Sequence, residues 1–379
     1  MVKVFYWSPF ISKIATPKAV VYSALSIKKY SRGTIEPTII NLFNEWNYYI
    51  NDIKENDLNI KSLFKLKKYI KLPEKGFLQS RLSFFLIFIL SFFPLLSLLK
   101  KKRPEYLIIH LSTSLPLILL SIFKFETKFI LRISGKPRLN FFRKILWKYV
   151  SNKLYKITTP TKIIAENLVQ QNIFSHEKVE ILYDPVIYLK KIRLNNRKRV
   201  NNFDRNKILA IGRLTKQKNF KFLIECFSEI SKKYNNFTLH ILGDGDEKTS
   251  LQKLIEKRNL NKKVFLEGYK SEISRHLINS YCFVLSSLWE DPGFVIIESA
   301  INNTIILSSN CETGPKEILK NKVNSFVFES NNKKSFLNSF DEMIKTDEKV
   351  KFKMKMSMKK SIKKFTLFQH YQKISKLVS

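Results

Sequence analysis

The stretch CFVLSSLWEDPGFVIIESA, residues 282–300, runs from an apolar segment through a loop into a helix, and it decides the fold. Its first part, Cys282–Ser286, has the length and apolar character of a buried strand. Gly293 permits a tight turn, after which residues 294–300 continue in a helical pattern. A strand that is followed closely by a helix is typical of a parallel sheet covered by helices.

The same alternation extends to both sides of this stretch. The further apolar runs that we predict as strands are Lys207–Ile211, Phe237–Leu242, Val264–Gly268 and Thr304–Ser308. The helix after the first run has one apolar stripe, formed by Phe220, Leu223, Phe227 and Ile230. We therefore expect an α/β domain at 206–355 that binds ligands at the carboxyl ends of its strands.

The N-terminal half has a similar, less regular pattern. Candidate strands are Val2–Trp7, Pro37–Phe43, Glu105–Leu111, Lys128–Ser134 and Lys153–Thr158, with helices at Ala15–Tyr30 and Phe141–Val150. A chain of 379 residues is also long for a single core. We predict two Rossmann-like domains facing each other across a cleft, at 1–186 and 206–355, a polar basic linker at 187–205, and a last helix at 356–379 that crosses back to the first domain.

Composition restricts the class of protein. Hydrophobic residues make up 44% of the chain and aromatic residues 13%, which is enough for two cores and argues against disorder. Lys and Arg number 68 against 31 acidic residues, a net charge of +37 that favours anionic partners, although a lysine-rich solvated surface explains it equally well. The three cysteines form no C-x-x-C pair and are expected as buried free thiols. The N-terminus starts as a strand without a signal-peptide pattern, so we expect a cytoplasmic protein.

One apolar segment differs from the rest. Residues 82–99, LSFFLIFILSFFPLLSLL, are nearly free of polar side chains and are followed by KKKR. The length is borderline for a spanning helix, which would also place the first strand across the membrane from its own sheet. A buried core helix and a helix lying in the membrane interface remain open, and we expect the interfacial one, with its basic end on anionic headgroups.

Two glutamates flank the glycine turn of the opening stretch. Glu290 lies on the loop and Glu298 on the helix, whose first amides, those of Phe294, Val295 and Ile296, are unpaired donors suited to a phosphate. Glu298 can accept hydrogen bonds from both hydroxyls of a ribose, and Glu290 can reach a sugar beyond the phosphates. Taken alone, the spacing also fits two ordinary acidic residues at a helix start.

A second set of residues lies at the same edge of the predicted sheet. Arg213 and Lys218 follow Gly212 in the loop after Lys207–Ile211, and Gly243 ends the next strand. Two cations at this spacing can clamp a diphosphate and neutralise it as it leaves. Together, the two glutamates and the two cations predict a site for a nucleoside diphosphate sugar, which neither set predicts by itself.

These motifs together resemble the family-4 (group 1) retaining glycosyltransferases, which have the two-domain GT-B fold. The loop Thr313–Glu317 is also similar to that of bacterial enzymes that build surface polysaccharides and lipopolysaccharides. The resemblance covers about 206–330 and rests on Gly212-Arg213-Leu-Thr-x-x-Lys218-Asn219, Gly243-Asp-Gly, Phe265-x-x-Gly268, the pair Glu290/Glu298, and Thr313-Gly-Pro-Lys-Glu-Ile318. It implies that Arg213 and Lys218 bind the donor diphosphate, that Glu298 holds the ribose, and that Glu290 contacts the transferred sugar.

The first domain is similar, more faintly, to acceptor domains of such enzymes. Ser12 and Lys13 belong to the loop after the first strand, and Ser134 and Gly135 end another strand where the family often has a histidine. His110 is the nearby histidine, and at a strand end it is more often structural than catalytic.

The resemblance implies transfer of a hexose or N-acetylhexosamine from a nucleoside diphosphate sugar, UDP-linked in the first instance, to a polyprenyl-pyrophosphate-linked or other lipid-linked glycan. We expect retention at the anomeric carbon, no metal cofactor, and peripheral attachment to the cytoplasmic face of an anionic inner membrane, with no nucleic acid as partner. Asp244-Gly-Asp246 is the one hint of a metal site and fits the turn of the family motif better. The alternatives are a non-catalytic glycosyltransferase-like subunit and a basic nucleic-acid-binding protein.

Overall fold

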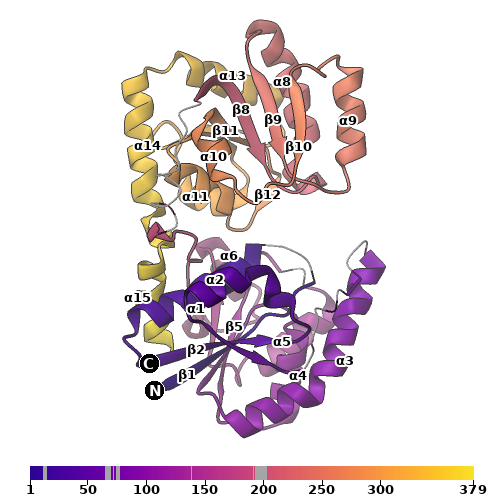
Figure 1. Ribbon diagram of the computed structural model, residues 1–379, viewed down its shortest axis with the longest axis vertical. Helices are drawn as coiled ribbons and strands as arrows, with labels where there is room; N and C mark the ends of the chain where they lie inside the picture. The colour runs from indigo at the N-terminus through magenta and orange to yellow at the C-terminus, as the bar shows by residue number, and fades with distance from the viewer. Residues whose placement is uncertain are drawn as a thin grey trace. The chain divides into compact units, whose positions relative to one another are not determined.

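The computed structural model describes residues 1–11, 15–64, 70, 72–73, 77–137, 139–190, 192 and 203–379. These residues form two compact units (Figure 1). The first comprises Met1–Val186 and Phe365–Ser379, and the second comprises Ile187–Lys364.

The first unit is built on a parallel sheet of seven strands, in the order β3-β2-β1-β4-β5-β6-β7. The strands are β1 (Val2–Trp7), β2 (Ile35–Asn41), β3 (Asn59–Ser62), β4 (Tyr106–Ile109), β5 (Lys128–Arg132), β6 (Lys156–Thr159) and β7 (Val179–Ile181). The order reverses between β1 and β4, which is where open parallel sheets bind ligands.

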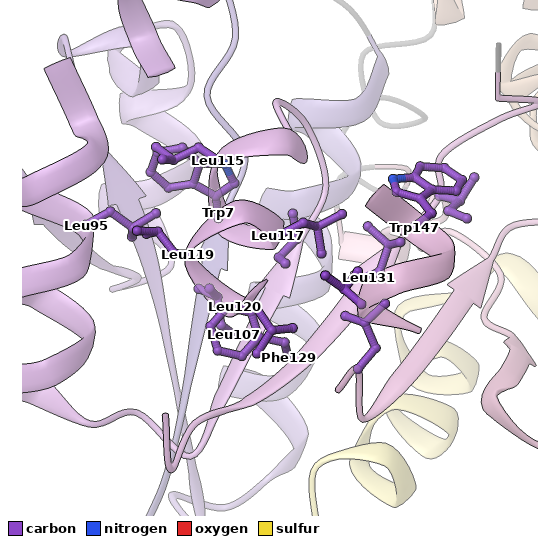
Figure 2. Packing of buried hydrophobic residues seen from close by; sticks show 14 of the residues in the cluster. Trp7, Leu95, Leu107, Leu115, Leu117, Leu119, Leu120, Phe129, Leu131 and Trp147 are labelled. Carbon is purple, nitrogen blue, oxygen red and sulfur yellow. The ribbon is translucent and has the colours of Figure 1, made fainter. Parts of the chain in front are cut away.

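Helices cover this sheet and share its core. They are α1 (Ala15–Tyr30), α2 (Ile50–Glu55), α3 (Phe77–Lys102), α4 (Ser114–Ile122), α5 (Phe141–Val150), α6 (Lys162–Gln170) and α15 (Leu367–Leu377), with short 3₁₀ turns at Glu45–Tyr49 and His176–Lys178. Figure 2 shows part of the core, in which Leu95 of α3 points toward Leu119 of α4, while Trp147 comes from α5. The last helix packs against α1, so the C-terminal segment belongs to the first unit.

The second unit has a parallel sheet of six strands, in the order β10-β9-β8-β11-β13-β15. They are β8 (Asp204–Ile211), β9 (Thr238–Leu242), β10 (Val264–Gly268), β11 (Ser280–Leu285), β13 (Ile305–Ser309) and β15 (Phe326–Phe328). A separate two-residue pair joins β12 (Trp289–Glu290) to β14 (Glu312–Thr313).

Seven helices and two 3₁₀ turns complete the described part of this unit and its boundary. The helices are α8 (Phe220–Lys233), α9 (Lys248–Lys257), α10 (Ser274–Ile278), α11 (Phe294–Ile301), α12 (Gly314–Ile318), α13 (Lys333–Lys345) and α14 (Glu348–Ile362), and the turns are Lys216–Lys218 and Lys363–Phe365. The apolar stripe predicted on α8 is buried as expected, and the three cysteines are free and buried.

The two predicted α/β domains with parallel sheets are confirmed. Two boundaries differ from the prediction. The predicted linker runs to Arg205, but β8 already begins at Asp204, and residues 191 and 193–202 of that linker lie outside the described residues. The last helix, predicted at 356–379, is two helices, since α14 ends at Ile362 in the second unit and α15 starts at Leu367 in the first.

The apolar segment 82–99 forms the middle of α3, which extends for 26 residues from Phe77 to Lys102. Among the described residues, Gln79–Lys102 is the one helical segment long and apolar enough to cross a bilayer, and 33% of its apolar window is buried. The inward side, with Ile87, Leu95 and Leu99, belongs to the core of the first unit. The segment is therefore not a fully buried core helix.

Candidate active site

The predicted donor residues of the second unit gather at the carboxyl ends of β8 and β11. These two strands are neighbours, and the strand order reverses between them. The loop after β8 carries Arg213 and Lys218, and the loop after β11 carries Glu290. Ser286 Oγ donates to the carbonyl oxygen of Lys218 at 2.8 Å, which joins the two loops directly.

Lys218 and Glu290 form an ion pair between Nζ and Oε1. The Lys218 side chain is 13% exposed and that of Glu290 is 7% exposed, so both charges are largely removed from water. Ser287 Oγ donates a second hydrogen bond of 2.6 Å to the same carboxylate oxygen. A paired and hydrogen-bonded carboxylate keeps one fixed orientation, because releasing it would leave a buried charge without a partner.

Two glycines allow the loops to approach this closely. A β-carbon on Gly243 would lie 1.8 Å from the carbonyl oxygen of Gly212, so no larger residue fits there. A β-carbon on Gly212 would lie 2.7 Å from Cε of Lys218, whose side chain therefore passes directly over the glycine backbone. The glycines predicted in the donor site thus shape the path of Lys218 toward Glu290.

The start of α11 has the geometry that the sequence predicts at Gly293. This residue precedes the helix with φ 83° and ψ 57°, the left-handed conformation that favours glycine. One expectation is wrong: the amide of Ile296 already donates to the carbonyl oxygen of Gly293 at 3.0 Å, as in a tightened first turn. The amides of Phe294 and Val295 are left as the donors for an anion at this helix start.

Arg213 and Glu298 flank the buried pair on different elements. Arg213 is exposed, and none of the ion pairs among the residues that the structure describes involves it. Glu298 is half-buried in the second turn of α11. The second unit therefore presents a cation, a paired lysine and carboxylate, a helix start and a second carboxylate along one edge of the sheet.

Further residues hold Glu290 in place. Thr313, the first residue of the predicted motif Thr313-Gly-Pro-Lys-Glu-Ile318, donates from Oγ1 to the carbonyl oxygen of Glu290. Ser309 Oγ donates to the carbonyl oxygen of Ser287 at 2.7 Å, and neither serine was singled out from the sequence. Cys311 is buried nearby, and burial first, with Glu290 adding to it, raises the pKa of its thiol to about 12. That thiol stays protonated, so it is no nucleophile.

The formal Asp-x-Asp motif is a turn. The carboxylate of Asp244 accepts a hydrogen bond of 2.9 Å from the amide of Gly245, and Lys248 lies 3.9 Å from it. Within the described ranges, no three or more His, Cys, Asp or Glu side chains are grouped as a metal site would require.

In the first unit, the acceptor-side candidates follow neighbouring strands. His110 comes directly after β4, and Ser134 and Gly135 come after β5, both at the carboxyl edge of the sheet. Ser12 and Lys13 lie outside the described residues. His110 is buried beside Tyr6, and burial, followed by the charge of Arg132, holds its pKa well below the usual value. The imidazole is therefore neutral.

The same edge has buried polar atoms without a hydrogen-bond partner among the described residues. They are Ser8 Oγ, His110 Nδ1, Ser112 Oγ, Ser134 Oγ and Thr158 Oγ1. Buried polar groups are nearly always paired in folded proteins, and these five follow or end β1, β4, β5 and β6, which are adjacent strands. Sequence reasoning identified His110 and Ser134, placed Ser8 at the start of the predicted acceptor loop Ser8–Lys13, and missed Ser112 and Thr158.

Residues 192–365 match the family model described as glycosyl transferases group 1. Among curated relatives, the chain is 34% identical over 252 residues to an uncharacterized glycosyltransferase of Methanocaldococcus jannaschii, a match that covers 61% of this chain and 62% of that one. A Campylobacter jejuni protein named N-acetylgalactosamine-N,N'-diacetylbacillosaminyl-diphospho-undecaprenol 4-alpha-N-acetylgalactosaminyltransferase is 28% identical over 213 residues, 55% of this chain and 57% of that one. The chain thus spans about three fifths of the length of such relatives.

The fold also matches solved structures over its whole length. A crystal structure of a mutant of TarM from S. aureus, in complex with fondaparinux, alpha-GlcNAc-glycerol and UDP, has a TM-score of 0.75 at 14% identity and covers 100% of both chains. This likeness shows the fold, the two-domain GT-B architecture, as the sequence motifs predict.

Proposed function

We propose that the chain is a group 1 glycosyl transferase and that it transfers a hexose or N-acetylhexosamine from a nucleoside diphosphate sugar to a lipid-linked glycan. The observation that carries the proposal is the buried pair of Lys218 and Glu290 at the point where the strand order reverses. Parallel sheets bind nucleotides at that point.

Each remaining donor residue has a place in this arrangement. Arg213 is exposed and has no ion-pair partner among the described side chains, so its guanidinium can pair with a diphosphate in bidentate fashion. The amides of Phe294 and Val295 supply the helix start, where an anion is stabilised. Glu298, one turn further, is suited to the two ribose hydroxyls. UDP is the nucleotide we propose first, since the TarM structure contains it.

The proposed transfer retains the anomeric configuration. The bond between the anomeric carbon and the diphosphate oxygen breaks, and the acceptor oxygen bonds to the same face of that carbon. The acceptor proton passes to the leaving phosphate oxygen, so no side-chain base is needed. Arg213, Lys218 and the start of α11 stabilise the charge that develops on the leaving group.

The same positive groups take the part that a divalent cation takes in other transferases. Their charge is fixed in place before the reaction, which is the condition under which electrostatic stabilisation is most effective. We therefore propose a metal-independent reaction, with no cofactor besides the sugar nucleotide. Activity that survives an excess of chelator would support this, and activity restored only by Mg²⁺ or Mn²⁺ would contradict it.

The acceptor side is assigned to the first unit. The unpaired polar atoms of Ser8, His110, Ser112, Ser134 and Thr158 lie at the carboxyl edge of its sheet, and the hydroxyls and phosphates of a glycan can satisfy them. The low pKa of His110 leaves a neutral imidazole, which suits hydrogen bonding to a sugar hydroxyl. A diphospho-polyprenyl glycan is proposed because the Campylobacter relative is named for one.

A thermal-shift panel of UDP, GDP and dTDP sugars tests the donor assignment. A ligand that binds only the folded state increases the free energy of unfolding, by about 2.7 kcal/mol at a ligand concentration one hundred times its dissociation constant. The melting temperature rises accordingly. We expect one UDP-sugar to shift the wild type most and to lose its effect in the Glu298→Ala variant. A panel without any shift would contradict donor binding. A shift without transfer to any lipid-linked acceptor would favour a non-catalytic subunit.

A further inference from the structure

Helix α3 exposes an apolar stripe on the side that faces away from the core. Leu82, Phe85, Ile89 and Phe93 follow one another at helical spacing, and Phe93 is 74% exposed. Over these residues the stripe is about 16 Å long, from the rise of 1.5 Å per residue. A soluble helix normally places polar residues on this side, so the stripe requires an apolar partner.

Helix α5 exposes a second apolar stripe. The sequence predicts this helix but not its exposed stripe. Phe142, Ile145 and Tyr149 are exposed at spacings of three and four, with Phe141 beside them, and Phe142 is 80% exposed. The opposite side of α5 is anchored by Trp147 and Val150, which are buried. An amphipathic helix would bury its aromatic residues, whereas α5 places more of them outside than inside.

The two helices belong to one face of the first unit. Helix α4 lies between them in the chain and packs against both (Figure 1). Its last residue, Ile122, is exposed as well. The exposed apolar residues of α3 and α5, together with Ile122, therefore lie on three helices that pack in succession, and we treat them as one patch.

Neither α3 nor α5 carries an acidic side chain, although Glu126, four residues after Ile122, pairs with Arg103 at the end of α3. No acidic residue occurs from Gly76 to Pro104 or from Thr127 to Ala165. Lys100, Lys101 and Lys102 are exposed at the end of α3, and Lys144 and Lys148 are exposed on α5. An apolar surface within a basic rim is complementary to an anionic bilayer, whose headgroups attract the cations while its acyl chains accept the aromatic side chains.

We propose that α3 and α5 form a two-helix docking surface, centred on Phe85, Phe93 and Phe142, that rests in the interface of an anionic membrane. Because the inward side of α3 is part of the core around Leu95, the helix lies along the membrane and does not cross it. Amphipathic helices of this kind enter the bilayer to a depth of about 5–10 Å. The alternative partner for this surface is a second copy of the chain. The same basic surface of that copy would supply no acidic side chains to the lysines of the rim.

Sedimentation of the full chain with vesicles tests the surface, using phosphatidylcholine alone and phosphatidylcholine mixed with anionic phosphatidylglycerol. The α3 variant is Phe85→Ser/Phe93→Ser and the α5 variant is Phe142→Ser/Ile145→Ser. We expect the wild type to prefer anionic vesicles and each variant to bind roughly tenfold or more weakly, since each removes two large apolar side chains. Lys100→Gln/Lys101→Gln/Lys102→Gln should reduce the preference for anionic lipid.

Phe352→Ser is the matched control, because Phe352 is 61% exposed on α14 of the second unit and Phe85 is 59% exposed on α3. The control should bind vesicles as the wild type does. All variants should keep the thermal shift with the donor, which separates a failed docking surface from a failed donor site. The proposal is overturned if the wild type ignores anionic vesicles or if the α5 variant binds unchanged. It is also overturned if the same variants dissolve a dimer in sedimentation velocity.

Discussion

Lys218 connects the stability of the donor site with its proposed chemistry. Its ammonium group has three N–H donors, and one of them serves the buried carboxylate of Glu290. The others can reach a phosphate, so the same pair that fixes the loop geometry also orients the cation. Glu290 is held from the other side by Ser287, and its contact with the transferred sugar therefore starts from a fixed carboxylate.

Replacing Lys218 with Ala should lower turnover by about a hundredfold and affect the donor KM less, because the lost charge matters most as the leaving group forms. The free energy of unfolding should also fall by about 3 kcal/mol, since Glu290 is left buried and unpaired. Steady-state kinetics and urea unfolding measure the two effects. Lys216→Ala, an exposed lysine in the same loop, is the control. A change in KM with unchanged kcat would refute the leaving-group role.

Glu298 is proposed to accept both hydroxyls of the ribose. Its replacement by Ala should weaken nucleotide-sugar binding by about 100-fold or more, since each of the two hydrogen bonds to a charged group contributes about 1.5–3 kcal/mol. Calorimetric titration with the UDP-sugar gives the dissociation constant directly. The Glu256→Ala variant, changed at an exposed residue of α9, should bind normally. Equal affinities in the wild type and Glu298→Ala would exclude the ribose contact.

At the scale of elements, the start of α11 depends on Gly293. Gly293→Ala forces alanine to φ 83° and places a β-carbon 3.2 Å from Cδ1 of Ile296, whose amide closes the first turn. We expect a loss of about 1 kcal/mol in stability and a weaker thermal shift with the donor. Differential scanning fluorimetry with and without UDP-sugar measures both.

Gly268 provides the matched comparison for that helix start. It has φ 71°, and a β-carbon there would meet no atom within 4 Å. Gly268→Ala should therefore lose a similar amount of stability through backbone strain and keep the full donor shift. If the two variants respond to the donor alike, the start of α11 takes no part in binding.

The elements that the sequence predicts are those with a strong apolar pattern. β1, β10, α1 and α5 have the predicted bounds, because each combines a clear period with distinct end signals. The missed strands β3, β7 and β15 are short strands at sheet edges. In β3 most residues face solvent, so its sequence shows no alternation of apolar and polar residues. Helix α3 extends beyond residues 82–99 because charged residues continue a helix as well as apolar ones do.

The candidate site follows the same division. Residues carried by short motifs, such as Arg213, Lys218 and Glu290, come together as predicted, since motif and strand end fix their place. The hydrogen bond from Thr313 to Glu290 accompanies the pairing of β12 with β14, two residues each, which no periodicity can indicate. Both residues belong to predicted motifs, but the contact between their loops is set by tertiary structure.

At the scale of the molecule, the last helix is tied into the first unit by an oriented chain of hydrogen bonds. His370 Nδ1 lies 2.7 Å from the carbonyl oxygen of Tyr183 and must donate to it, so Nε2 accepts from Ser23 Oγ at 2.8 Å. The hydroxyl of Tyr6 then donates to Ser23 at 3.0 Å. The bond from Ser23 to Nε2 requires a neutral imidazole, because a protonated ring has no acceptor nitrogen, and burial lowers the pKa of His370 to about 3.

Acid should therefore loosen the attachment of α15. In the unfolded chain His370 titrates near its usual pKa of about 6.5, whereas the folded chain keeps it neutral to about 3. The unfolded state alone takes up this proton below about pH 6.5, so stability is complete above that pH and declines as the pH falls, by at most about 1.4 kcal/mol per unit. His110 acts in the same direction, and Glu45, whose pKa burial raises to about 7, acts in the opposite one.

Comparison with His370→Gln isolates the contribution of this histidine, because His110 and Glu45 are present in both proteins. The variant should be less stable than the wild type near neutral pH, since the oriented chain of hydrogen bonds is broken. Its disadvantage should shrink steadily as the pH is lowered, because glutamine takes up no proton in the unfolded state. Urea unfolding at a series of pH values, monitored by tryptophan fluorescence, gives the difference in free energy. Parallel stability curves for the two proteins would show that His370 is charged in the folded chain and that the proposed hydrogen-bond orientation is wrong.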